Sequence, residues 1–148
     1  MPGNLIVLIE YALIAACVGF AYWQGGRADR LGAIWFGANM ILSGVVTVAG
    51  FRSTVVQLVM DGTYALGLLP LAMIYVSYSM GLLTLLSAAL FCLEALYLLN
   101  DWPVDKTYID INNILWFIAP LIFLGCGLVN LRRNRRAARA ERTAMAAA

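Results

Sequence analysis

The stretch STVVQLVMDGTYALGLLPLAMIYVSYSMGLLTLLSAALFCLEALYLL, residues 53–99, decides the fold. A helix covers the ~30 Å of a bilayer's hydrocarbon with about 20 residues, so this stretch is far longer than one crossing needs. It therefore predicts two membrane crossings back to back, folded at residues 77–81. Such a hairpin brings Asp61, near one end of the stretch, and Glu94, near the other, to the same side of the membrane.

The composition of the whole chain agrees with a membrane protein. Of its 148 residues, 63% are hydrophobic and only 12% are charged, and there is no histidine. Soluble domains carry about 25% charged residues, so a water-soluble fold of this composition would lack a polar surface. We expect a single transmembrane domain over residues 1–131 and a basic cytoplasmic tail over residues 132–148.

Five apolar runs predict an all-α bundle of five transmembrane helices. Their approximate bounds are 5–23, 31–50, 54–77, 81–99 and 111–131. Gly62, Gly67 and Pro70 weaken the third run, which leaves a tilted or partly re-entrant segment open as an alternative. The first run, with Glu10 inside it and no basic residue before it, reads as a retained helix and not as a cleaved leader.

The distribution of basic residues predicts the orientation of the five crossings in the membrane. With the N-terminus outside and the C-terminus inside, eight of the ten basic residues face the cytoplasm: Arg27, Arg30, Arg132, Arg133, Arg135, Arg136, Arg139 and Arg142. Only Arg52 and Lys106 face outward. This asymmetry on short loops follows the positive-inside rule and predicts a multi-pass protein of the bacterial inner membrane.

Aromatic residues support the same frame, because tryptophan and tyrosine gather at membrane interfaces. The rings expected at the inner interface are Tyr22, Trp23, Trp35, Tyr75 and Tyr78, and those expected at the outer one are Phe51, Tyr97, Trp102 and Tyr108.

Three acidic residues fall inside predicted crossings. At 1.5 Å per residue, Glu10, Asp61 and Glu94 each lie roughly 8–10 Å in from the outer end of their helix, so they share one layer. Asn39 and Gln57 are polar neighbours. A charge at the bilayer centre costs about 2.5–3.5 kcal/mol, so these groups need a proton, a cation, water or a partner's basic residue.

Three interpretations of the acids stay open. They can form a proton- or cation-binding cluster that opens toward the outer face. Alternatively, they are hydrogen-bonded links between helices, worth about 0.6 kcal/mol each, or line a wet vestibule. Pairing with another subunit is a third use.

Small residues offer weaker signals. Cys17, Cys92 and Cys126 form no CxxC pair and are expected to be small buried packing residues. The pairs Ala15/Gly19, Ala33/Gly37 and Gly125/Gly127 favour close helix approach, and packing within the monomer is the expected use, with dimerisation as the alternative.

Polar segments outside the helices suggest lipid contact and little chemistry. The six arginines of the tail, listed above, are expected to contact anionic lipid at about 1 kcal/mol each and not nucleic acid. Asp101, Asp105 and Asp110 lack the spacing of a calcium loop, so we expect no metal and no cofactor. No nucleophile–base pair or phosphate-binding loop is present, which argues against an enzyme.

The string GGRADRL, residues 25–31, follows the first predicted helix, and the third helix carries Asp61. In these features the chain resembles small uncharacterised bacterial inner-membrane proteins with five helices, a resemblance that implies no activity. Glu10 in the first helix is also similar to the glutamate of small multidrug exporters. The helix count differs there, and no functional residue is carried over.

Two classes of function remain. The first is a non-enzymatic accessory or interaction protein that acts through helix packing with itself or with a larger membrane complex. The alternative is a small proton- or cation-coupled transporter or channel that uses Glu10, Asp61 and Glu94. A transporter needs a polar cavity that all three acids line, and an accessory protein does not.

Overall fold

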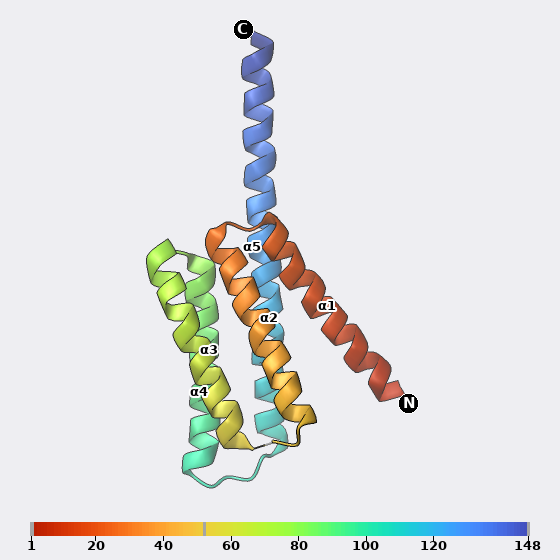
Figure 1. Ribbon diagram of the computed structural model, residues 1–148, viewed down its shortest axis with the longest axis vertical. Helices are drawn as coiled ribbons and strands as arrows, with labels where there is room; N and C mark the ends of the chain where they lie inside the picture. The colour runs from red at the N-terminus through yellow and green to blue at the C-terminus, as the bar shows by residue number, and fades with distance from the viewer. Residues whose placement is uncertain (1, 52, 148) are drawn as a thin grey trace.

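The computed structural model describes the backbone of residues 2–51 and 53–147, and all regular structure in this part of the chain is helical. Its helices are α1 (Pro2–Gln24), α2 (Arg27–Val48), α3 (Thr54–Tyr75), α4 (Tyr78–Leu99) and α5 (Lys106–Ala147). Figure 1 shows α2 to α5 as a bundle, with the second half of α5 extending beyond it. The predicted all-α class is confirmed. Arg52, expected at the outer face, lies outside the described residues.

Four of these helices are long and apolar enough to cross a membrane: α2, α3, α4 and the Lys106–Thr143 part of α5. Large apolar side chains on the outside of the bundle, such as Leu66, Ile74 and Leu85, are mostly exposed. In water such a surface would be unfavourable, and in hydrocarbon it is solvated. This is the architecture of a multi-pass membrane protein.

The predicted hairpin exists, and its turn is tighter than residues 77–81. Val76 ends α3 in the left-handed conformation with φ 46° and ψ 46°, and its N–H donates to the Ala72 carbonyl. Ser77 is the residue that precedes α4, and the Ser77 and Ser79 hydroxyls share a 2.7 Å hydrogen bond. A left-handed C-terminal residue satisfies the last carbonyls of α3 and reverses the chain within two residues. Gly81 therefore lies inside α4.

Two helices begin earlier than predicted because a carboxylate organises each start. The Gly26 N–H donates to Asp29 Oδ2 at 3.1 Å, so α2 starts at Arg27 and not at residue 31. The Tyr108 N–H donates to Asp105 Oδ1 at 2.8 Å, so α5 starts at Lys106 and not at residue 111. Both contacts satisfy backbone donors that a helix start otherwise leaves unpaired.

The predicted tail is helical and continues α5 without interruption to Ala147. Alanine and arginine are good helix formers, which accounts for the continuation. Figure 1 shows this half of the helix alone, with no other helix beside it. The six tail arginines are exposed along it.

The packed core lies where α2 crosses α3, α4 and α5. The ring of Phe36 lies 5.8 Å from Tyr64, 6.0 Å from Trp116 and 5.4 Å from Phe123 between centroids. Leu68, Met80 and Leu83 belong to the same buried cluster, together with several alanines. Aromatic pairs at these tilts add to the stability that burial provides.

Helix α1 packs closely on α5 at one end only. A Cβ added to Gly127 would lie 2.5 Å from the Phe20 ring, so this glycine allows the two helices to meet. Toward its N-terminus, α1 leans away from the other helices (Figure 1). A Cβ on Gly19, Gly37 or Gly125 would touch nothing, so the prediction of packing within the monomer is wrong for these three.

One further sequence prediction needs correction. Only Cys17 is buried, whereas Cys92 is exposed and Cys126 is half-buried, because the last two lie toward the outside of the bundle. Tyr108, near the start of α5, is buried among protein groups. Its ring packs 4.8 Å from that of Tyr97, and α5 begins early enough to carry it inside the bundle.

Candidate functional site: a polar cavity shared by five helices

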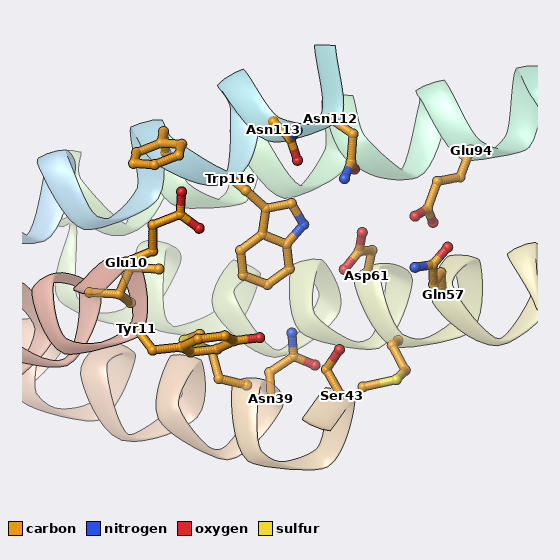
Figure 2. A pocket seen from close by; sticks show the side chains of 14 residues that line it. Glu10, Tyr11, Asn39, Ser43, Gln57, Asp61, Glu94, Asn112, Asn113 and Trp116 are labelled. Atoms are coloured by element: carbon orange, nitrogen blue, oxygen red, sulfur yellow. The ribbon is translucent and has the colours of Figure 1, made fainter. Parts of the chain in front are cut away.

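A cavity of about 360 Å³ opens among the helices, and each of α1 to α5 contributes to its wall. Its lining residues are Glu10, Tyr11, Ile14, Asn39, Met40, Ser43, Gln57, Met60, Asp61, Glu94, Asn112, Asn113, Trp116 and Phe117. Figure 2 shows the polar side chains pointing into one space around the Trp116 indole. The cavity is within the size range of small-molecule sites.

All three predicted acids line this cavity. Asp61 on α3 is 6% exposed and Glu94 on α4 is 2% exposed, so the bundle encloses both. Glu10 on α1 is half-buried. Asn39 and Gln57, predicted as their polar neighbours, line the same cavity. Counting residues along each predicted helix therefore identified five polar residues that share one cavity.

Glu94 is only partly satisfied by protein groups. The Tyr108 hydroxyl donates to Glu94 Oε1 across a long 3.5 Å contact. Glu94 Oε2 is fully buried and has no hydrogen-bond partner among the described residues. A buried polar atom without a partner is costly, so a proton on this oxygen or a donor supplied to it would be stabilising.

The other polar groups of the cavity are neutral. Amide side chains from α2, α3 and α5 and the Ser43 hydroxyl can each donate or accept a hydrogen bond. None of the described lining residues is Lys or Arg. The described lining residues therefore supply up to three negative charges and no positive charge.

Aromatic, thioether and aliphatic side chains form the rest of the wall. Trp116 belongs to the cavity and also packs against the core through Phe36. Its indole is therefore held on one side by the packed core while the other side faces the polar space. An aromatic face of this kind attracts cations.

The described residues hold no cluster of three or more His, Cys, Asp or Glu side chains close enough to bind a metal ion. The three acids thus share a cavity without converging on one point. This arrangement suits protons, hydrated ions or a molecular cation that extends between them.

Several lining residues were missed by sequence reasoning. Asn112, Asn113 and Trp116, all within the predicted fifth run, and Tyr11 in the first were not singled out from the sequence. Their apolar runs did not indicate which side of each helix faces the other helices. The three-residue step from Asn113 to Trp116, close to one helical turn, was the available signal. Asp101 and Asp110, considered for calcium, do not line the cavity.

A third buried carboxylate, outside the cavity, lies at the opposite end of the bundle. Asp29 is 7% exposed, accepts from Ser79 Oγ at 2.7 Å and accepts from Asn130 Nδ2 at 2.9 Å. Together with its contact to the Gly26 N–H, these bonds tie the start of α2 to α4 and α5. Asp29 is saturated with donors and serves as an interhelical connection, unlike Glu94.

Comparisons with known proteins give no relative. No family model, no curated protein and no solved structure matches the chain. The functional argument therefore rests on the cavity itself.

Proposed function

We propose that this protein is a small cation-translocating membrane protein, of the proton- or cation-coupled transporter or channel class, and that the polar cavity is its cation site. The observation that supports this most directly is the buried, unpartnered Glu94 Oε2 in a cavity shared with Asp61 and Glu10. An anion in this position without a counter-charge costs several kcal/mol. A proton or a bound cation removes that cost.

The residues have distinct proposed roles. Asp61 and Glu94 are the enclosed acceptors of a proton or cation, and Glu10 is the more accessible third acid. Asn39 and Gln57 replace part of the hydration shell of a cation, because amide oxygens are good ligands for it. None of these roles requires bond-breaking chemistry or a cofactor.

The proposal includes five crossings, with α1 as the fifth, an outside N-terminus and an inside C-terminus. The excess of arginine at the C-terminal end supports this orientation. In this orientation the cavity lies in the outer half of the bilayer, and the tail arginines lie at the anionic cytoplasmic leaflet of a bacterial inner membrane.

The test is a flux measurement on the full chain in liposomes that contain a pH-sensitive dye. Gradients of Na⁺, K⁺ and tetramethylammonium are imposed separately, each with and without a pH gradient. We expect a saturable proton or cation flux with the parent protein. It should be lost in the triple variant Glu10→Gln, Asp61→Asn, Glu94→Gln.

The matched control is Asp110→Asn with Glu141→Gln, two exposed acids outside the cavity. This variant should retain the parent flux. A parent protein that behaves like the triple variant and like empty liposomes under every gradient would refute a role in translocation.

A second candidate is the accessory role in helix packing. An apolar groove of about 630 Å³ runs between α1 and α2, and Gly19 and Gly37 line it without being packed against. Small residues that are unused inside a monomer favour contact with another transmembrane helix. Cross-linking in membranes through Gly19→Cys tests this role: a specific dimer supports it, and a monomer at all protein densities contradicts it.

A further inference from the structure

The charges in the cavity are divided between two ends. In Figure 2, Glu10 lies on one side of the Trp116 indole, and Asp61, Gln57 and Glu94 lie on the other. The acids come from different helices and lie at different positions along the cavity. A single small ion could therefore contact one end and would leave the other uncompensated.

The space between the two ends is suited to hydrocarbon. The Trp116 indole lies there (Figure 2). Ile14, Met40, Met60 and Phe117 also line the cavity and add apolar wall to it. An alkyl chain that lies on the indole buries apolar surface that would otherwise face water. An ammonium near the face of the indole gains a cation–π attraction. Amide oxygens of Asn39, Asn112 and Asn113 accept further hydrogen bonds.

We infer that the cation bound here is an alkyl diamine, doubly protonated at neutral pH, with one ammonium at each acidic end. This inference rests on the proposed function and specifies its substrate class. Each ammonium has three N–H donors and no acceptor, which matches carboxylate and amide oxygens. One of these donors satisfies Glu94 Oε2, a buried atom without a partner among the described residues.

The size and chemistry of the cavity argue against large ligands, tightly coordinated metal ions and anions. Its volume of about 360 Å³ is near the lower limit for small-molecule sites, so it holds a short aliphatic molecule with some water. The described residues give no converging metal ligands. Anions are excluded because the described lining residues include three acids and no basic group.

The test compares putrescine with n-butylamine, which has the same carbon chain and one ammonium fewer. Binding is measured by isothermal titration calorimetry on the full chain in mild detergent near neutral pH. We expect putrescine to bind about tenfold more tightly or better, because the second ammonium gains charge-assisted hydrogen bonds.

Single variants then separate the two ends. Glu10→Gln should reduce the preference for putrescine to within about twofold and leave n-butylamine binding nearly unchanged. Glu94→Gln should weaken both ligands, because it changes the enclosed end that either ammonium occupies. Glu141→Gln, in the exposed tail, is the control and should change neither.

The outcomes distinguish this inference from the proposed function. Equal affinity for the two amines, or a preference for putrescine that Glu10→Gln leaves intact, would overturn the two-ended site. A cation flux in liposomes without any amine binding would overturn the diamine inference and leave translocation standing. If the parent protein shows neither cation flux nor amine binding, both proposals are refuted.

Discussion

Two carboxylates away from the cavity, Asp29 and Asp105, have structural roles that can be measured separately from its function. Each accepts more than one hydrogen bond, and each determines where a helix begins. Glu94 is the contrasting case, because one of its oxygens is buried without a partner. At this scale, the number of donors around a carboxylate separates structural acids from candidate binding acids.

Replacing Asp29 by alanine removes the acceptor shared by Ser79 and Asn130. The Asn130 amide then loses this acceptor and the Ser79 hydroxyl keeps only Ser77, both in a half-buried site, so we expect the free energy of unfolding to fall by roughly 1–3 kcal/mol. Thermal or denaturant unfolding in detergent measures this change. Glu141→Ala, in the exposed tail, is the control, and an equal effect of the two substitutions would show that the Asp29 contacts do not contribute to stability.

Asp105 gives a pH-dependent prediction. The Tyr108 N–H, and then the Tyr97 hydroxyl, hold the pKa of the Asp105 carboxyl below its usual range. A lowered folded pKa means that the contribution to stability is complete above the ordinary value of about 3.9 and is lost as the pH falls through the folded value. Asp105→Ala should therefore lower the melting temperature at neutral pH, and its difference from the parent should shrink in acid. A difference that stays constant with pH would contradict the ionic cap.

At the scale of the helices, α1 is the element whose packing is most uneven. It meets α5 closely where Gly127 leaves space for Phe20, and it leans away toward its N-terminus. Glu10 lies on the leaning part, so the cavity depends on how firmly the other end is anchored. Helices α3 and α4, by contrast, are held together by their two-residue turn.

Two glycines of α5 test this anchoring. Gly127→Ala should destabilise the protein by about 1–3 kcal/mol, because the added methyl group would overlap the Phe20 ring. Gly125→Ala has open space around its Cβ and should be neutral or slightly stabilising, since alanine favours helix. Unfolding in detergent measures both. Equal changes in stability for the two substitutions would mean that the contact between α1 and α5 does not require a glycine at position 127.

For the whole molecule, the asymmetry of basic residues predicts the orientation in the membrane. In a variant whose native cysteines are replaced, Thr143→Cys on the exposed end of α5 should react with a membrane-impermeant maleimide only after the cells are permeabilised. Reaction in intact cells would place the C-terminal end outside and would reverse the proposed topology.

The sequence was informative where burial in hydrocarbon leaves few choices. A long apolar stretch needs helices, and Asp61 and Glu94 could be placed in one layer by counting residues. The first residues of α2 and α5 were predicted too late in the sequence, because Asp29 and Asp105 act through local hydrogen bonds that a hydrophobicity pattern does not reveal. The contribution of Trp116 to the cavity depends on how α5 is rotated against the core, which periodicity alone left undetermined.

The central claim is that the acids line a water-accessible cavity inside an otherwise lipid-facing bundle. In the cysteine-free background, Gln57→Cys, which lies in the cavity wall, is compared with Leu85→Cys, which is exposed on the outer surface of α4. The reagent is a charged, water-soluble methanethiosulfonate applied to the protein in lipid vesicles. We predict rapid modification at position 57, slowed by putrescine, and little at position 85. No modification at position 57, or equal modification at both positions, would contradict the account.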